Sequence, residues 1–112
     1  MTYCTSSDVG SRLALDSAQR TRAANRLTSV INRATIDIDQ EFRDYGRDAP
    51  TGATGTMADI LKEICADIAA SYYLEDEAVF QTANNDGSVR SNYLRTRGFN
   101  NLQRLAHLGD VS

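Results

Sequence analysis

The longest unbroken helical pattern in this chain is the stretch SAQRTRAANRLTSVINRATIDIDQEFRDY, residues 17–45. It contains neither glycine nor proline, and its apolar residues recur at the spacing of one helix face. These apolar residues are Leu27, Val30, Ile31, Ala34, Ile38, Phe42 and Tyr45. The pattern predicts one helix from Ser17 to Tyr45, roughly 40 Å long at about 1.5 Å per residue. The rest of so short a chain cannot wrap that face fully, which points to contacts with neighbouring subunits.

Capping patterns bound this helix and predict a shorter one before it. The box Asp16–Gln19 starts the long helix, and Gly46 ends it because glycine adopts the left-handed conformation at little cost. A second box, Thr5–Asp8, predicts a short helix that ends near Leu15.

Two further helices are expected after the long one. The box Thr56–Asp59 starts an amphipathic helix, which is the best candidate for the centre of the core. The turn signal Asn84–Gly87 precedes a last helix from about Ser88 to Leu108. Within that helix Gly98 is a candidate bend and costs roughly 1 kcal/mol relative to alanine. Residues 78–87 show no clear pattern.

Together these elements predict an all-α fold. Residues 1–112 form one domain, a small bundle of about four helices with one long central helix. Loop 46–56 is expected to be flexible, residues 47–57 are the only place for a short β-hairpin, and 109–112 form a short tail. The predicted core draws on three helices: Leu27, Ile31, Ile38, Ile60, Ile64, Ile68, Leu102 and Leu105.

Composition narrows the class of protein. Of the chain's 112 residues, 41% are hydrophobic, an ordinary fraction that argues against wholesale disorder. The net charge of −3 argues against non-specific binding to nucleic acid. We find no pattern of a signal peptide or of a membrane span. Cys4 and Cys65 are expected to be reduced, structural thiols in a cytoplasmic setting, with an exported disulfide as the alternative.

No combination of residues points to catalysis. The one histidine, His107, lies near a helix end, where packing or the helix dipole accounts for it better than general-base chemistry. Residues Gly52–Thr56 lack the lysine of a phosphate-binding loop. The acidic run Glu75–Glu77 is more typical of a solvated helix end than of a cation site. We therefore predict no enzyme, no cofactor and no metal.

Charge is distributed unevenly over the predicted helices. The long helix is basic in its first half and acidic in its second, which is the reverse of what the helix dipole favours. The next helix is acidic and the last one basic. Two interpretations are open. The charges form an ordinary surface of mixed charge on a soluble protein, or the acidic face of one subunit meets the basic face of the next in a closed ring. The residues predicted to lie between subunits are Arg20, Arg22, Arg26, Asp37, Asp39, Glu41, Glu63, Asp67, Arg90, Arg95 and Arg97.

Short motifs along nearly the whole chain resemble those of one family. They are YCTxxDVxxRL at residues 3–13, IxxAxxDID at 31–39, ICADIA at 64–69, and the final helix with its short tail over 93–112. This combination resembles the bacteriophage head–tail connector proteins of the Mu-like kind. Residues 46–56 and 78–87 depart from the family pattern, so partner contacts made there are the least transferable.

The resemblance implies a small helical adaptor without catalytic residues, which binds beneath the portal of a filled capsid as a ring of about twelve copies. Such an adaptor extends the DNA channel, lets genomic DNA pass without specific binding, and docks the next neck, stopper or tail protein. It belongs to the virion neck and is assembled in the host cytoplasm. No membrane is involved.

The last helix and its tail are the predicted portal-docking element. The helix is basic, and the polar tail carries one isolated aliphatic residue, a composition that suits an extended docking segment. The predicted residues are Arg104, His107, Leu108, Gly109, Asp110, Val111 and Ser112. The alternative function is a small helical regulator that binds DNA or a partner protein. Its binding residues would be Arg90, Arg95, Arg97 and Arg104.

Overall fold

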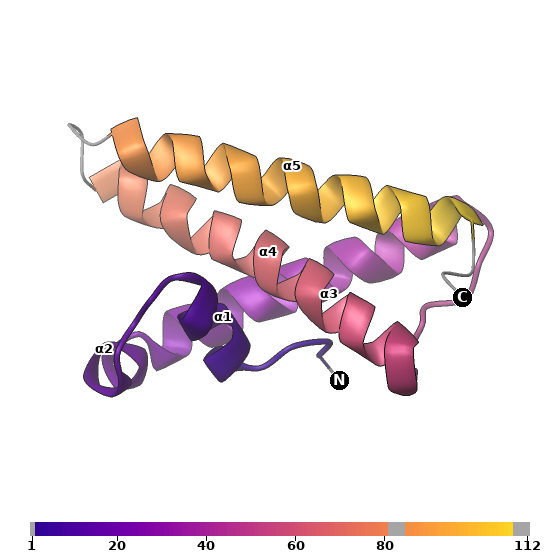
Figure 1. The fold of residues 1–112 in the computed structure, drawn as a ribbon, viewed down its shortest axis with the longest axis horizontal. Helices are drawn as coiled ribbons and strands as arrows, with labels where there is room; N and C mark the ends of the chain where they lie inside the picture. Colours follow the sequence, from indigo (N-terminus) through magenta and orange to yellow (C-terminus); the bar gives the residue numbers. More distant parts are fainter. Residues whose placement is uncertain (1, 81–84, 109–112) are drawn as a thin grey trace.

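The fold is a bundle of helices, and the described residues contain no strand (Figure 1). The computed structural model describes residues 2–80 and 85–108, with the backbone alone for 77–80, 85–89 and 108. The helices are α1 (Ser6–Arg12), α2 (Ser17–Arg22), α3 (Ala24–Asp44), α4 (Gly55–Phe80) and α5 (Asn85–Leu108). The all-α prediction is confirmed. The β-hairpin expected within 47–57 is wrong, because that segment is an irregular loop running into α4.

The first two helices begin where the sequence predicts. Both capping boxes, Thr5–Asp8 and Asp16–Gln19, are formed by reciprocal side-chain and backbone hydrogen bonds. However, α1 ends at Arg12, earlier than the predicted end near Leu15. Its end is set by Ala14, which adopts a left-handed φ of 57° and closes the helix through backbone hydrogen bonds to the last turn.

The helix predicted over residues 17–45 is two helices. Ala23 has φ −95° and ψ 10°, so the chain turns between α2 and α3. No glycine or proline marks this break, and α2 itself buries no residue, whereas Ala23 is buried at the junction. Packing therefore imposes a break that the local sequence does not. At the other end Gly46 has φ 73°, and the predicted stop is confirmed.

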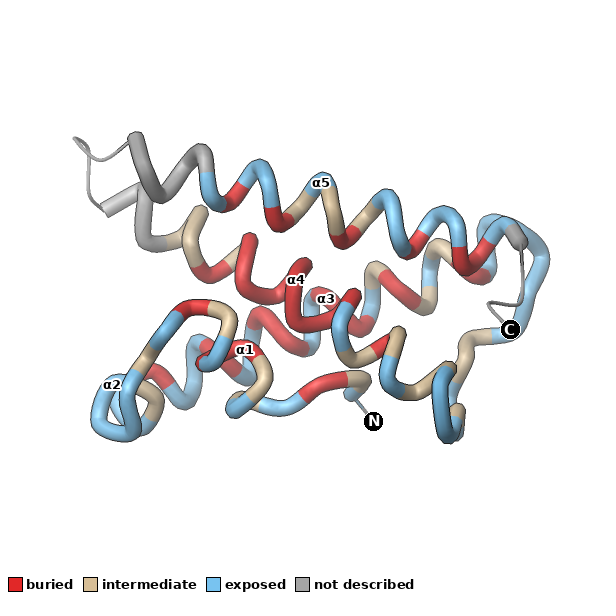
Figure 2. The backbone as a smooth tube through the Cα atoms, viewed as in Figure 1, coloured by how far each residue is buried: buried red, intermediate tan, exposed pale blue. Residues whose placement is uncertain are grey.

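The centre of the molecule is α4, as predicted for the helix that follows the Thr56 box, and not the long helix predicted over residues 17–45. Helix α4 is the longest helix, with 26 residues, and every residue from Ile64 to Ser71 is buried (Figure 2). It packs against α1, α3 and α5. The sequence predicts one buried face, but its neighbours cover every face of this central stretch. Every residue of the predicted core is buried except Ile60, which is half-buried against it.

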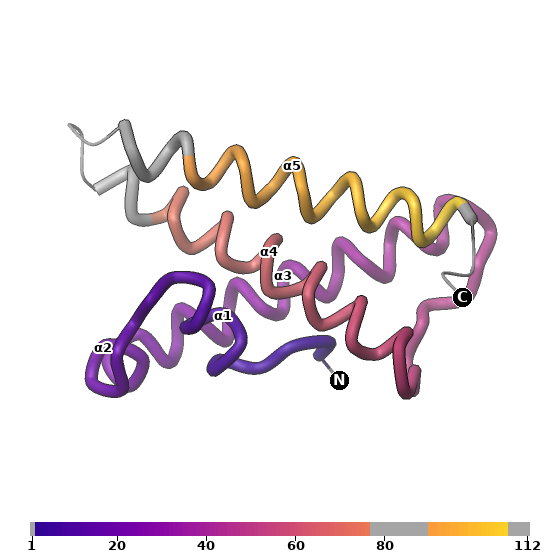
Figure 3. Tube along the Cα trace, viewed as in Figure 1, coloured from indigo at the N-terminus to yellow at the C-terminus, as the bar shows by residue number. Residues whose placement is uncertain are grey.

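Helix α5 runs back along α4 in the opposite direction (Figure 3). It begins at Asn85, so the part of the predicted turn from Asn85 to Gly87 is helical, and Asn84 lies outside the described residues. Gly98 lies inside continuous helix and is buried, facing Ile68 of α4. Tyr93, predicted on the apolar side with Leu94, is 60% exposed.

Helix α4 begins at Gly55, so the predicted cap Thr56 lies inside its first turn. Residues 47–54 form an irregular connection between α3 and α4, and their predicted flexibility stays a prediction. The predicted tail, residues 109–112, lies outside the described residues.

Candidate interaction surface

A buried carboxylate joins three helices at the middle of the bundle. Asp67 of α4 is 2% exposed. Its Oδ1 atom accepts hydrogen bonds from Arg12 Nε at 2.7 Å and from Arg97 Nη2 at 2.6 Å. Its Oδ2 atom accepts from Arg97 Nε at 2.9 Å. These hydrogen bonds to Asp67 raise the pKa of Arg97 above its ordinary value. The cluster fixes α1 and α5 to α4 and satisfies a charge that would be costly to bury alone.

This cluster corrects part of the predicted subunit interface. Asp67 and Arg97 were both expected at a surface between subunits, but they bind each other inside one chain. Arg12 also forms an ion pair with Glu63, and Arg95 forms one with Glu75. The complementarity between the acidic and the basic helix is therefore intramolecular, because α4 and α5 lie side by side.

Arg90, the remaining basic residue of the predicted interface on α5, also makes a contact within the chain. Arg90 donates a hydrogen bond to the backbone carbonyl of Arg12. Of the four arginines in the alternative DNA-binding prediction, only Arg104 makes no side-chain hydrogen bond or ion pair within the described residues. The other three hold the bundle together.

The acidic residues predicted on the long helix bind tyrosines. Asp37 accepts a hydrogen bond from the hydroxyl of Tyr72, and Asp39 accepts one from Tyr3. Burial, together with the hydrogen bond to Asp37, raises the pKa of Tyr72 to about 12. The guanidinium of Arg33 lies 4.0 Å from the centre of the Tyr72 ring. These contacts tie α3 to α4 and to the segment before α1.

Not every charge of the predicted interface binds a partner in the described part of the chain. Within the described residues, the side chains of Arg20, Arg22 and Glu41 make no hydrogen bond or ion pair. Arg22 is exposed, whereas Arg20 and Glu41 are half-buried. The two arginines lie on α2, and Glu41 lies in the last turn of α3. The two groups are thus separated by most of the length of α3, about 25 Å from Ala24 to Glu41 at 1.5 Å per residue.

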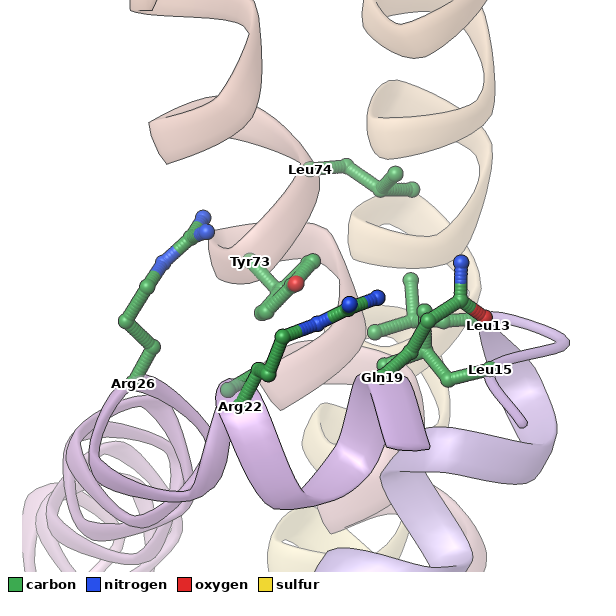
Figure 4. A pocket seen from close by; sticks show the side chains of 8 residues that line it. Leu13, Leu15, Gln19, Arg22, Arg26, Tyr73 and Leu74 are labelled. Atoms are coloured by element: carbon green, nitrogen blue, oxygen red, sulfur yellow. The ribbon is translucent and has the colours of Figure 1, made fainter. Parts of the chain in front are cut away.

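A hollow of about 400 Å³ opens between α2, the start of α3 and α4 (Figure 4). Its lining combines an apolar base with polar side chains at the edge. The apolar residues are Leu13, Leu15, Ala23, Tyr73 and Leu74, and the exposed polar ones are Gln19, Arg22 and Arg26. The guanidinium of Arg26, another predicted interface residue, lies 4.2 Å from the centre of the Tyr73 ring. Arg22 of α2 and Arg26 of α3 thus lie at the opening of the same hollow.

The last turns of α5 carry the described part of the predicted docking element. Arg104 and His107 are exposed, and the His107 ring lies edge-on to Tyr45 with 5.3 Å between ring centres. The side chain of Leu108 and all of Gly109–Ser112 lie outside the described residues. Sequence reasoning missed Tyr45 here, because it was counted among the apolar face of α3 and is 45% exposed.

Two hollows meet at Arg104. One, of about 490 Å³, lies against the end of α3 and is lined by Tyr45, Asn100, Gln103, Arg104 and His107. The other, of about 330 Å³, lies between α4 and α5 on the other side of Arg104. It is lined by Asp59, Ile60, Glu63, Ile64, Asn101, Arg104 and Leu105. This end of α5 can therefore accept side chains of a partner on both sides of one exposed cation.

Sequence reasoning also missed Arg12, the second cation on Asp67. Positions 12 and 67 are related only by the packing of α1 on α4, so no local pattern could have linked them. Among the described residues, no group of three or more His, Cys, Asp or Glu side chains is arranged to hold a metal ion. Nor is any described helix long and apolar enough to cross a membrane.

No protein-family model matches this chain, and neither does any curated protein or solved structure.

Proposed function

We propose that this protein is a structural subunit of a bacteriophage neck, a head-to-tail adaptor that forms a ring beneath the portal. Its motifs resemble those of the connector family along nearly the whole chain. The observation that carries the proposal is the exposed end of α5, where Arg104 stands between two hollows directly before residues 109–112 in the sequence. That combination suits a site where a larger partner docks.

The proposed docking element is Arg104–Ser112. Arg104 and His107 project from a helix that α3 and α4 hold in place. The sequence continues into a polar segment with one aliphatic residue, Val111. Such a segment can add main-chain hydrogen bonds to an exposed strand edge while its aliphatic side chain fills one pocket. In this proposal the hollows beside Arg104 receive side chains of the portal.

Contacts between subunits of the ring are proposed to use charges at opposite ends of α3. A head-to-tail contact needs two different surfaces on each subunit, and it closes into a ring when the rotation permits. Arg20 and Arg22 lie at one end and Glu41 at the other. In the proposed ring of about twelve copies, genomic DNA passes through the lumen without specific binding. The face away from the portal docks the next neck, stopper or tail protein.

The test is binding to portal rings from the same phage genome. Deletion of Gly109–Ser112 should leave the circular dichroism and melting temperature unchanged but abolish attachment of the protein to the portal. The matched control is the double substitution Asp110→Ser and Val111→Gly, which keeps the length of the tail. It should weaken attachment without abolishing it, because main-chain hydrogen bonds remain.

Unchanged attachment of the deletion variant would reassign docking to another surface, such as loop 46–56. Failure of the intact protein to join portal rings at all would refute the adaptor function itself. Electrophoretic retardation of duplex DNA that is lost in Arg104→Ala would instead support the regulator.

A further inference from the structure

Hydrogen bonds of the residues on both sides of Cys4 hold the segment before α1 in place. Tyr3 donates its hydroxyl hydrogen to Asp39 of α3, and Thr5 caps α1. Between them Cys4 is 4% exposed and points at α4, where Cys65 is fully buried. The two sulfur atoms are 2.8 Å apart, and both cysteines are free thiols. They are the only cysteines in the chain.

The contact between the two thiols shifts their pKa values in opposite directions. Cys4 donates its hydrogen to the sulfur of Cys65. That hydrogen bond and burial raise the pKa of Cys4, whereas accepting it lowers the pKa of Cys65. While Cys4 rests on the bundle, Cys65 is thus the sulfur that more readily becomes a thiolate. A thiolate is the form that attacks a disulfide.

We propose that Cys4 and Cys65 are a covalent modification site, at which a small-molecule disulfide such as oxidised glutathione converts the two thiols into an intramolecular disulfide. The sulfur atoms are 2.8 Å apart and an S–S bond is about 2.05 Å long, so the bond needs only a small shift of the segment before α1 toward α4. This site is independent of the proposed portal function.

The exchange proceeds in two balanced steps. When the segment before α1 lifts from the bundle, Cys4 loses its proton to water, and its thiolate attacks one sulfur of oxidised glutathione. A mixed disulfide forms and one glutathione thiolate leaves. After the segment returns, Cys65 loses its proton to water, its thiolate attacks the sulfur of Cys4, and the second glutathione leaves as a thiolate. Each of the two glutathione thiolates then takes up one of the protons released by the protein thiols. Two protein thiols are oxidised, and one glutathione disulfide is reduced to two glutathione molecules.

The bond would connect positions 61 residues apart, across α1, α2, α3 and the first part of α4. Closing so long a loop in the unfolded chain lowers its entropy and stabilises the folded state. Because the sulfurs already touch, little native strain offsets this gain. The oxidised protein should melt roughly 10 °C above the reduced one.

The experiment equilibrates the folded, intact protein in glutathione buffers of increasing oxidised fraction, then alkylates free thiols and determines the products by mass spectrometry. The matched control is the double variant Cys4→Ser with Ser7→Cys, which keeps two cysteines but moves one to an exposed position on α1. The native pair should form the intramolecular disulfide in buffers in which the control still holds free thiols or mixed disulfides. The higher melting temperature should appear together with that product.

Three results would overturn the proposal. The native protein could stay reduced in buffers that oxidise the same chain in guanidinium chloride. It could instead stop at mixed disulfides or link to a second molecule. Finally, the intramolecular bond could form but lower the melting temperature, which would mean that the two sulfurs meet only in a distorted chain.

Discussion

Replacement of Gly98 by alanine separates what the local sequence favours from what packing allows. Within a helix, alanine is more favourable than glycine by roughly 1 kcal/mol. In the folded protein, however, a Cβ atom at position 98 would lie 2.7 Å from Cγ1 of Ile68 and 3.2 Å from Cβ of Asp67. The backbone nitrogen of Ile68 would be 3.4 Å away. Helices α4 and α5 thus approach closely where one of them has no side chain.

The size of the stability loss depends on how far the side chain of Ile68 can move away from the added methyl group. Its side chain is fully buried, so it cannot turn into solvent to make room. Adding a methyl group to a well-packed core costs about 1–3 kcal/mol, and a contact this short belongs to the upper part of that range. Subtracting the helix preference of roughly 1 kcal/mol leaves a net loss of about 1–2 kcal/mol in the free energy of unfolding.

Urea unfolding followed by circular dichroism measures this loss. The control is Thr96, an exposed position on the same helix, compared as Thr96→Ala and Thr96→Gly. There alanine should be the more stable by about 1 kcal/mol, the reverse of the order at position 98. In the background of Ile68→Ala, which removes the clashing atom, Gly98→Ala should cost less than it does in the native protein.

A Gly98→Ala protein that gained as much stability as the alanine form gains at position 96 would refute the reasoning. The two helices would then be further apart at this point than the structure places them. Equal costs of Gly98→Ala with and without Ile68 would likewise show that the contact is not the cause.

Two further predictions concern the polar contacts. Asp67→Asn should lower the free energy of unfolding by about 2–3 kcal/mol, because it removes the buried negative charge between Arg12 and the partly exposed Arg97. Glu63→Gln, which alters the exposed ion pair of the same cluster, should cost less than about 1 kcal/mol in the same denaturation assay. A similar loss for both would argue against the burial of Asp67. The pKa of Tyr72 is raised to about 12, above the ordinary tyrosine value of 10.0, so the native state favours its protonated form. Its contribution to stability should be complete below pH 10.0 and be lost as the pH rises to about 12. Tyr72→Phe should flatten that fall in urea midpoints, and an unchanged pH profile would contradict the assignment.

Capping signals in the sequence predicted three helix ends correctly, but the cap predicted at Thr56 lies inside the first turn of α4. The boxes at Thr5 and Asp16 and the stop at Gly46 are confirmed, because each depends on hydrogen bonds or backbone angles among neighbouring residues. No capping side chain, glycine or proline marks the break at Ala23 or the early end at Ala14. Alanine is a good helix former, so only contacts with distant residues can stop a helix there.

The candidate surface was harder to predict for the same reason. The sequence indicates which helices are acidic and which are basic, but not whether opposite charges face each other within one chain or between two. The packing of α4 against α5 and α1 decides that Asp67, Glu63 and Glu75 bind arginines of their own chain. It also leaves Arg104 exposed between two hollows.

By itself, the sequence determined the helical class of this protein, the residues of its core and the caps that start its first two helices. Apolar period and capping are local properties, and the helical hydrogen bonds they support join residues a few positions apart. Only the tertiary structure decided that neighbours cover every face of the middle of α4, that Gly98 permits the close approach of α5, and that Cys4 touches Cys65. These features join positions far apart in the chain, and burial of a shared core brings them together.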